Sequence, residues 1–161
     1  MLCKDFVPPN ADGSDLALYV CVKTTHSPSV LVVEDEFCIR DILVELFEVE
    51  GTQVRSAATL ESAKTVLASH EFDLIVTDIR LGGRRDGGLQ VMAAAGVLSP
   101  NATVIALTAY PDDDNRRASL RLGATHFLEK PISLETIASF AAQAGVPTAM
   151  TPLVPEAIGT Q

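Results

Sequence analysis

The sequence predicts an α/β protein built on a doubly wound, five-stranded parallel sheet that is flanked by five helices. Short runs rich in β-branched residues occur at 30–33, 53–55, 73–77, 103–107 and 125–128. Segments with apolar residues every three or four positions separate these runs, and this alternation is typical of βαβ units. The central runs are apolar throughout, which indicates strands that are covered on both faces.

The first two helical segments have clear apolar faces and end signals. In the first segment, apolar residues recur at helical spacing and Gly51 is expected to close the helix as a C-cap. Its inward residues are Ile39, Leu43, Leu46, Phe47 and Val49. In the second segment, Thr59 is placed to cap the helix. Its inward residues are Leu60, Ala63, Val66 and Leu67.

The remaining three helical segments are marked by their first turns. The third begins near Asp86-Gly87-Gly88 and is expected to bury Leu89, Met92 and Ala93. The fourth, 112–122, has three aspartates in its first turn and arginines later, which complements the helix dipole and predicts the pairs Asp112/Arg116 and Asp113/Arg117. Ser133 can cap the fifth, with Leu134, Ile137 and Phe140 facing inward.

Chain length and composition favour one domain with a substantial core. The chain has 161 residues, of which 47% are hydrophobic and 20% are charged. The net charge of −9 argues against a direct nucleic-acid partner, because modules that bind the phosphate backbone are usually basic. The early apolar run 16–22 is too short to span a bilayer and lacks a signal-peptide layout, so no membrane partner is expected.

The ends of the chain differ in composition from its middle. Residues 1–29 contain the turn signals Pro8-Pro9, Asp12-Gly13 and Ser27-Pro28 and are expected to form an irregular N-terminal extension, in which 16–22 can add a short strand or pack on the domain. Residues 30–144 form the predicted domain. Residues 145–161 contain three prolines and are expected to be a flexible C-terminal tail.

The three cysteines predict no disulfide framework. Cys3, Cys21 and Cys38 form no CxxC pair and no zinc-type pattern with histidine. This usage indicates a reducing, cytoplasmic location. Cys38 lies within the first helical pattern and is interpreted as a packing residue.

Polar residues stand at the carboxyl ends of four of the five predicted strands. They are Glu34 and Asp35 after the first, Asp78 after the third, Thr108 after the fourth and Lys130 after the fifth. Right-handed crossovers bring all of these strand ends to one edge of the sheet, where ligands bind at the switch in strand order. Carboxylates held this closely repel one another, so a divalent cation is their natural companion.

Each of these residues has a role to play around a phosphoryl group. Asp35 and Asp78 can hold Mg²⁺ through oxygen, with Glu34 acting through water. Asp78 can also attack phosphorus in line. Thr108 and Lys130 can each contact a phosphoryl oxygen, and the lysine and the cation together neutralise the charge on the transferred group.

Taken singly, these residues have ordinary structural explanations. An aspartate at a strand end is more often a helix N-cap than a nucleophile. A threonine after a strand is usually structural, and a Lys-Pro dipeptide alone indicates a turn. Their joint occurrence at one predicted edge favours the functional interpretation.

These motifs, in this order and spacing, resemble the receiver domain of bacterial two-component response regulators. The matching segments are 30–36 (VLVVEDE), 74–81 (LIVTDIRL), 106–110 (ALTAY), 122–124 (LGA) and 127–131 (FLEKP). The separations of 43 residues from Asp35 to Asp78, 30 to Thr108 and 22 to Lys130 are also typical. The resemblance covers residues 30–144 and implies a flavodoxin-like sheet of strand order 2-1-3-4-5.

The resemblance implies a set of roles for the pocket residues. Asp78 is the implied phosphate acceptor, taking phosphate from a sensor histidine kinase or a phosphotransfer protein. Glu34 and Asp35 are the implied acidic pair for Mg²⁺, and Asp78 and the backbone carbonyl of Arg80 are the other protein ligands. Thr108 and Lys130 are implied to bind the phosphoryl group and to assist catalysis.

The resemblance also implies a switch and a shield around the pocket. The Lys130-Pro131 peptide bond is expected to be cis. Phe127 matches the switch aromatic, which moves inward when Thr108 swings toward phosphate and so alters the surface of the fourth helix, fifth strand and fifth helix. Arg80 and Tyr110 flank the pocket, where the bulky Tyr110 is expected to slow self-hydrolysis.

The chain departs from the family pattern after Leu81. The usual proline is missing, and Gly82-Gly83-Arg84-Arg85-Asp86 follows Leu81 instead. The glycine that normally ends this loop, Gly87, therefore stands one position further from Asp78 than in the family pattern. Two glycines without a proline predict a more mobile loop. The two arginines can attract phosphate or a kinase, although solvated loop charge is the plainer interpretation.

The resulting hypothesis is a stand-alone response regulator receiver. It is expected to be a signalling phosphoacceptor rather than an enzyme and to pass its signal to a downstream protein partner. Helix four, strand five and helix five are the candidate surface for a homodimer. The alternative is a degenerate receiver that acts without phosphorylation. A haloacid dehalogenase-type hydrolase is disfavoured because Arg80 stands where its acid/base aspartate would be, and a Rossmann domain because 34–36 is acidic rather than glycine-rich.

Overall fold

Five parallel strands form the central layer of the domain, in the order β2-β1-β3-β4-β5. The computed structural model describes residues 26–150. The strands are β1 (Ser29–Val33), β2 (Gln53–Ala57), β3 (Leu74–Asp78), β4 (Thr103–Thr108) and β5 (His126–Glu129). This order confirms the predicted doubly wound sheet, and each predicted strand is found within one or two residues of its expected bounds.

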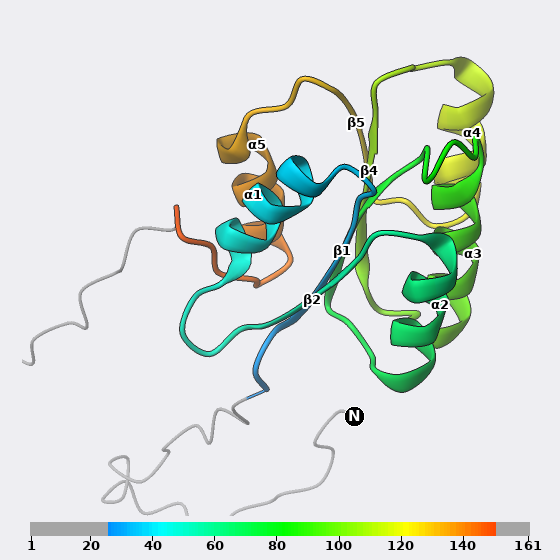
Figure 1. Ribbon diagram of the computed structural model, residues 1–161. Coiled ribbons are helices and arrows are strands. Elements are labelled where there is room, and N and C mark those ends of the chain that lie inside the picture. The colour runs from blue at the N-terminus through cyan, green and yellow to red at the C-terminus, as the bar shows by residue number, and fades with distance from the viewer. Residues whose placement is uncertain (1–25, 151–161) are drawn as a thin grey trace, which may run out of the picture.

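Five helices cover the two faces of the sheet. They are α1 (Phe37–Phe47), α2 (Leu60–Ser69), α3 (Gly87–Leu98), α4 (Asp113–Arg121) and α5 (Leu134–Gln143). Helices α1 and α5 lie on one face, and α2, α3 and α4 lie on the other (Figure 1). Across residues 26–150, no helix combines the length and the apolar character that a membrane crossing requires.

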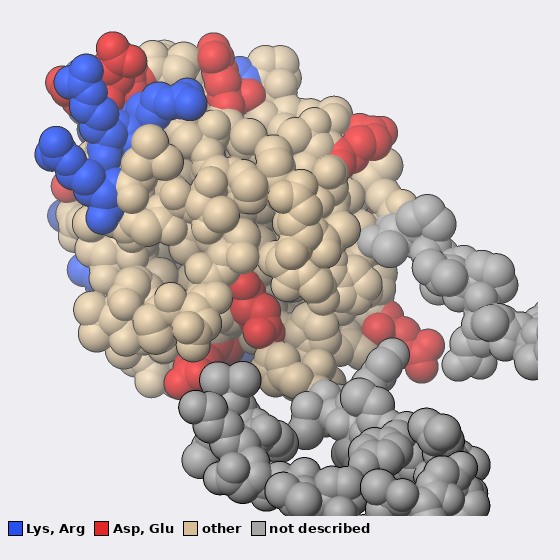
Figure 2. Space-filling model, turned by 180° about the vertical axis from the view of Figure 1, so that it is seen from behind, with Lys and Arg blue, Asp and Glu red and all other residues tan. Residues whose placement is uncertain are grey.

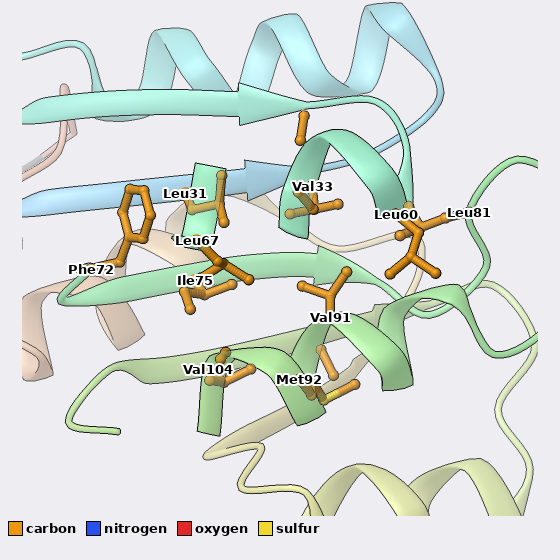
Figure 3. Packing of buried hydrophobic residues seen from close by; sticks show 14 of the residues in the cluster. Leu31, Val33, Leu60, Leu67, Phe72, Ile75, Leu81, Val91, Met92 and Val104 are labelled. Carbon is orange, nitrogen blue, oxygen red and sulfur yellow. The ribbon is translucent and has the colours of Figure 1, made fainter. Parts of the chain in front are cut away.

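The central strands are buried on both faces, as their uninterrupted apolar runs predict. In β1, Leu31 and Val33 belong to the core cluster beneath α2 and α3, whereas Val30 and Val32 belong to the cluster beneath α1 and α5. Figure 3 shows the first cluster, with Leu31, Val33, Ile75 and other strand residues packed against residues of α2 and α3. Successive side chains of a strand therefore point to opposite faces of the sheet and pack into two separate cores.

Helix α4 begins one residue later than expected. The carboxylate of Asp112 accepts hydrogen bonds from the backbone N–H of Asn115 at 2.7 Å and from its side-chain amide at 2.6 Å, so Asp112 is the N-cap. The predicted ion pairs Asp112/Arg116 and Asp113/Arg117 are wrong, because neither is among the ion pairs of residues 26–150. The capping bonds occupy the Asp112 carboxylate instead. The predicted caps of α2 and α5, Thr59 and Ser133, are confirmed.

Three expectations for individual helix residues are wrong. Helix α1 ends at Phe47, so Gly51, although its φ of 84° is left-handed, lies in the following turn and is not the C-cap. Ala93 is exposed, because Val91 and Ala95 share the inward face of α3 with Met92. Cys38 is exposed at the start of α1, one position away from the inward face.

The chain beyond α5 packs on the domain instead of starting a tail at residue 145. Val146 and Thr148 are buried, and the backbone N–H of Ala149 donates to the carbonyl of Leu46 at 2.8 Å. Residues 145–150 thereby join the end of α5 to the end of α1. The expectations for 1–25, including the strand at 16–22 and two of the cysteines, and for the tail after residue 150 lie outside the described residues.

Candidate functional site

The candidate site lies at the carboxyl edge of the sheet, where β1 and β3 are neighbours. The chain order reverses between these two strands, and the loops that leave them diverge to opposite faces. Glu34 and Asp35 follow β1, and Asp78 is the last residue of β3. These positions bring together acidic residues that are more than 40 positions apart in the sequence.

Lys130 joins two of these acidic residues. Its ammonium Nζ lies 2.6 Å from Asp78 Oδ2 and 2.7 Å from Glu34 Oε2. The Glu34 side chain is 2% exposed and the Asp78 side chain 11% exposed, so both carboxylates are largely removed from water. An unpaired carboxylate at this depth would be strongly unfavourable, and the ammonium supplies the counter-charge.

The pKa values of Glu34 and Lys130 are shifted for different reasons. Burial raises the pKa of Glu34 above its ordinary value, and this effect outweighs the opposing influence of Lys130. Burial alone would lower the pKa of Lys130, but its hydrogen bonds to Asp78 and Glu34 and their negative charges raise it instead. The lysine is therefore firmly cationic at neutral pH.

Backbone donors hold each of the three carboxylates. The N–H of Arg80 donates to Asp78 Oδ1 at 3.1 Å, and the N–H of Glu36 donates to Glu34 Oε1 at 3.3 Å. The N–H of Gly82 donates to Asp35 Oδ2 at 3.0 Å. These bonds fix the carboxylates within the loops and leave lone pairs free for further ligation.

Two residues of the site were missed by sequence reasoning. The guanidinium of Arg40 donates to the backbone carbonyl of Glu34 at 2.7 Å and to that of Asp35 at 3.2 Å, so it braces the loop after β1. Gly82 binds Asp35 through its backbone. An arginine five residues after an acidic pair is a signal that can be read from sequence, whereas a backbone N–H contact between distant loops leaves none.

The chemistry and spacing of the carboxylates fit a divalent cation. Glu34, Asp35 and Asp78 each offer one oxygen, and these oxygens all lie within 4.8 Å of one another. Oxygens on opposite sides of an octahedral Mg²⁺ are about 4.2 Å apart, since its ligands lie about 2.1 Å away. A small adjustment of the side chains therefore makes room for one hard, oxygen-ligated cation.

A hollow of about 390 Å³ opens above the carboxylates. Its lining residues are Glu34, Asp35, Glu36, Ile39, Asp78, Arg80, Gly83, Ala109, Tyr110 and Lys130. Arg80 and Tyr110 stack on one another at its rim, with the guanidinium carbon 3.9 Å from the ring centroid. The predicted flanking residues are therefore in direct contact.

Thr108 and Phe127 are not among the residues that line the hollow. Thr108 is buried at the end of β4, and its hydroxyl oxygen accepts a hydrogen bond from the backbone N–H of Tyr110 at 3.1 Å. Phe127 is half-buried in β5, and the guanidinium carbon of Arg116 lies 5.5 Å from its ring centroid. The Lys130-Pro131 peptide bond is cis, as the resemblance implies.

The loop after Leu81 forms a defined turn, and its expected mobility stays a prediction. Leu81 and Arg84 exchange two backbone hydrogen bonds, of 3.1 and 2.9 Å, around Gly82 and Gly83. Both glycines have left-handed φ values, 57° and 78°, as a two-residue hairpin turn requires. Together with the bond to Asp35, these contacts define one tight turn at the rim of the hollow.

Comparison with known families identifies the domain. Residues 30–142 match the model of the response regulator receiver domain. The chain therefore belongs to the receiver family of two-component response regulators, as its motifs predict. Members of this family are signalling phosphoacceptors, interact with histidine kinases or phosphotransfer proteins, and bind Mg²⁺ or Ca²⁺ at an acidic pocket.

Individual relatives agree with this assignment. The chain is 32% identical over 108 residues to sporulation initiation phosphotransferase F of Bacillus subtilis, covering 67% of this chain and 86% of that protein. It is 35% identical over 115 residues to the response regulator protein PilR of Pseudomonas aeruginosa, covering 71% of this chain but only 25% of the relative. The chain thus spans most of the first protein and a quarter of the second.

Solved structures share the fold. A CheY-like receiver domain from Methanospirillum hungatei superposes with a TM-score of 0.67 at 27% identity, covering 72% of this chain and 91% of that one. A response regulator from Burkholderia pseudomallei superposes with a TM-score of 0.64 at 28% identity, covering 73% and 69%. The latter crystal structure contains a phosphorylated aspartic acid, a calcium ion and citrate.

Proposed function

We propose that the protein is a phosphorylation-controlled receiver whose acceptor is Asp78. The observation that carries this proposal is the bridge from Lys130 Nζ to both Asp78 and Glu34 at a cluster of three carboxylates. Such an arrangement places a nucleophilic carboxylate, a fixed cation and a metal-type donor set around one point. These are the components that phosphoryl transfer requires.

The proposed reaction moves a phosphoryl group from a phosphohistidine to Asp78. A carboxylate oxygen of Asp78 attacks phosphorus, the P–N bond to the imidazole breaks, and the imidazole leaves with the bonding electron pair. The product is an acyl phosphate. Lys130 can release one carboxylate oxygen and follow the incoming charge, and the hydroxyl of Thr108 can donate to another phosphoryl oxygen.

The implied Mg²⁺ would be held by Glu34, Asp35, Asp78 and the backbone carbonyl of Arg80, and it would neutralise charge on the transferred group. Lys130 already binds two of the three carboxylates in the described structure. The lysine therefore keeps the acceptor paired before transfer and remains beside the phosphoryl group afterwards.

The proposed switch passes from Thr108 to Phe127. Movement of the Thr108 hydroxyl toward phosphate breaks its contact with the N–H of Tyr110 and reshapes the end of β4. Phe127 lies on the neighbouring strand, where Ala106 and Phe127 are partners in the register of β4 and β5. An inward turn of its ring would remove its contact with Arg116 of α4 and change the exposed surface there.

An apolar groove beside the hollow suits the protein that donates phosphate. The groove has a volume of about 640 Å³ and lies between α1 and the loop into α5. Its lining residues are Ile39, Ile42, Leu43, Leu107, Lys130, Pro131, Ile132, Leu134 and Ile137. A kinase or phosphotransfer helix seated in this groove would hold its phosphohistidine next to Lys130.

A second surface, which includes α4, is available for output or for a second copy. Viewed from behind, Lys and Arg side chains gather at the upper left, the corner where α4 lies, next to a broad uncharged area (Figure 2). Arg116, Arg117 and Arg121 of α4 are exposed, and so is Leu120. We propose that α4, β5 and α5 form the partner or homodimer surface.

The direct test is phosphorylation by a small phosphodonor. Incubation of the protein with acetyl phosphate or phosphoramidate and Mg²⁺ should add the mass of one phosphoryl group, and Asp78→Asn should prevent the addition. Omission of Mg²⁺ or addition of EDTA should do the same. A protein that binds Mg²⁺ but gains no mass would overturn the proposal in favour of a degenerate receiver, and one without either property would overturn the metal site as well.

Two further expectations accompany this function. Turnover of external phosphate esters should be negligible, because Arg80 stands two residues after the acceptor, where an acid/base carboxylate would be needed. A phosphatase assay with a generic phosphate ester tests this point. A cytoplasmic location stays a prediction.

A further inference from the structure

We infer that the Gly82-Gly83 turn positions the carboxylate of Asp35 for its cation. This inference rests on the proposed metal site and adds a positioning element from the segment that departs from the family pattern. The contact that carries it is the hydrogen bond from the Gly82 N–H to Asp35 Oδ2, which joins the loop after β3 to the loop after β1.

Asp35 needs such a contact more than the other two acidic residues do. Glu34 and Asp78 are buried and paired with Lys130, whereas Asp35 is exposed and forms none of the ion pairs of residues 26–150. An exposed aspartate loses rotamer freedom when it ligates a cation. The Gly82 bond occupies Oδ2 and leaves Oδ1 for ligation, so it orients the ligand in advance.

The turn itself is held by the core. Leu81 is 2% exposed and belongs to the apolar cluster beneath α2 and α3. A Cβ on Gly87 would lie 2.8 Å from the Leu81 Cβ, so the start of α3 packs directly against Leu81. The two backbone bonds between Leu81 and Arg84 then fix where the tip of the turn, and hence the Gly82 N–H, is presented.

Gly82 and Gly51 provide a matched pair for a test. Both have left-handed φ values, 57° and 84°, and a Cβ added at either position would meet nothing within 4 Å. Alanine at either site therefore carries the same kind of backbone strain. Gly51 lies in the turn between α1 and β2, at the other end of the domain, and only Gly82 binds Asp35.

Isothermal titration with MgCl2, together with thermal melts in EDTA, separates positioning from stability. Gly82→Ala and Gly51→Ala should lower the melting temperature by similar amounts, but only Gly82→Ala should weaken Mg²⁺ binding, by about tenfold. Gly82→Asn should restore most of the affinity, because asparagine tolerates the left-handed φ that strains alanine and so leaves the backbone N–H in its place. Equal Mg²⁺ affinity in the two alanine variants, or no recovery with asparagine, overturns the inference.

Amide hydrogen exchange supplies a second measurement that needs no variant. The Gly82 N–H of the unaltered chain should exchange more slowly than the Gly83 N–H, both without and with Mg²⁺; equal and rapid exchange would contradict the bond to Asp35. If the unaltered chain binds no Mg²⁺ at all, the proposed metal site fails. If it binds Mg²⁺ and the Gly82 results are negative, only the positioning role fails.

Discussion

The guanidinium of Arg80 lies over the ring of Tyr110, with 3.9 Å between its central carbon and the ring centroid. The stack stands at the rim of the hollow above Asp78, the proposed acceptor. Tyr110 is itself exposed, so its position depends on this contact more than on core packing. We therefore expect the two residues to act together as a shield for a phosphorylated Asp78.

Replacement of Tyr110 by alanine should therefore speed self-hydrolysis. An exposed cation–π contact contributes about 0.5–1 kcal/mol. Loss of this whole amount from the activation free energy of hydrolysis corresponds to a roughly two- to fivefold faster release of phosphate. Phosphate release from the purified phosphoprotein measures the rate. Tyr110→Phe retains the ring and should behave like the unaltered chain, whereas an unchanged or slower rate in the alanine variant would count against the shielding role.

Removal of the ammonium of Lys130 should destabilise the domain in EDTA. Lys130→Met leaves the buried carboxylates of Glu34 and Asp78 without a counter-charge, and we expect a loss of about 2–3 kcal/mol in the free energy of unfolding. The double variant with Glu34→Gln should lose less, because one of the two charges is gone. Urea unfolding at pH 7 measures both, and a Lys130→Met domain as stable as the unaltered one would contradict the ion-pair argument.

Gly88 should be intolerant of any side chain. A Cβ at this position would lie 2.1 Å from the carbonyl oxygen of Asp78 and 2.7 Å from the Cα of Ile79, so α3 must move away from the strand that carries the acceptor. We expect Gly88→Ala to lower the free energy of unfolding by about 1–3 kcal/mol and to reduce phosphorylation.

Gly96 of the same helix is the control for this substitution. A Cβ there meets nothing within 4 Å, so Gly96→Ala should stabilise the domain by about 0.5–1 kcal/mol through helix propensity alone. Chemical denaturation and the phosphodonor assay measure both variants. Similar behaviour of the two would show that the close approach at Gly88 is unimportant.

Asp73 should make stability depend on pH in the acid range. Burial acts to raise its pKa, but hydrogen bonds from the N–H and hydroxyl of Ser29 and the contact with His26 outweigh this, and the net effect lowers the pKa below its ordinary 3.8. A depressed folded-state pKa contributes stability that is present above the unfolded value and is lost as the pH falls through the folded value.

Asp73→Asn should consequently cost about 1 kcal/mol at pH 7, a modest amount because the carboxylate is partly exposed and screened by water. The difference between variant and unaltered chain should stay constant down to about pH 4 and shrink below it. Urea unfolding at a series of pH values from 7 to 3 measures this difference. A difference that grows on acidification would have the wrong sign for this explanation.

Most of the architecture was predictable because it depends on local patterns. Uninterrupted apolar runs, helical spacing and side-chain caps such as Thr59 and Ser133 each act over a few residues. The parallel direction of the strands follows from the alternation of strands and helices along the chain. The errors fall where a local pattern has two readings. Asp112 was placed inside α4, although it is the N-cap of that helix. Ala93 was assigned to the buried face of α3, although successive residues of a helix are rotated by about 100° and Ala93 points outward.

For the site, the sequence indicated which residues stand at strand ends, and the structure brings Glu34, Asp35, Asp78 and Lys130 together. Their roles in phosphate and metal chemistry remain predictions. Arg40 and Gly82 were not anticipated, because both act on the backbone or through it. A glycine pair suggested a mobile loop, yet the same freedom allows the tight turn that reaches Asp35.

Strand periodicity, the order of the elements and the chemical types at their ends are properties of short stretches of chain, so they could be read directly and were enough to identify the receiver family. The contacts of Asp35 with Gly82, of Lys130 with Glu34 and of Ala149 with Leu46 join positions 47, 96 and 103 residues apart. Such contacts depend on how the layers pack and on where each loop is anchored by the core, and no local pattern encodes either.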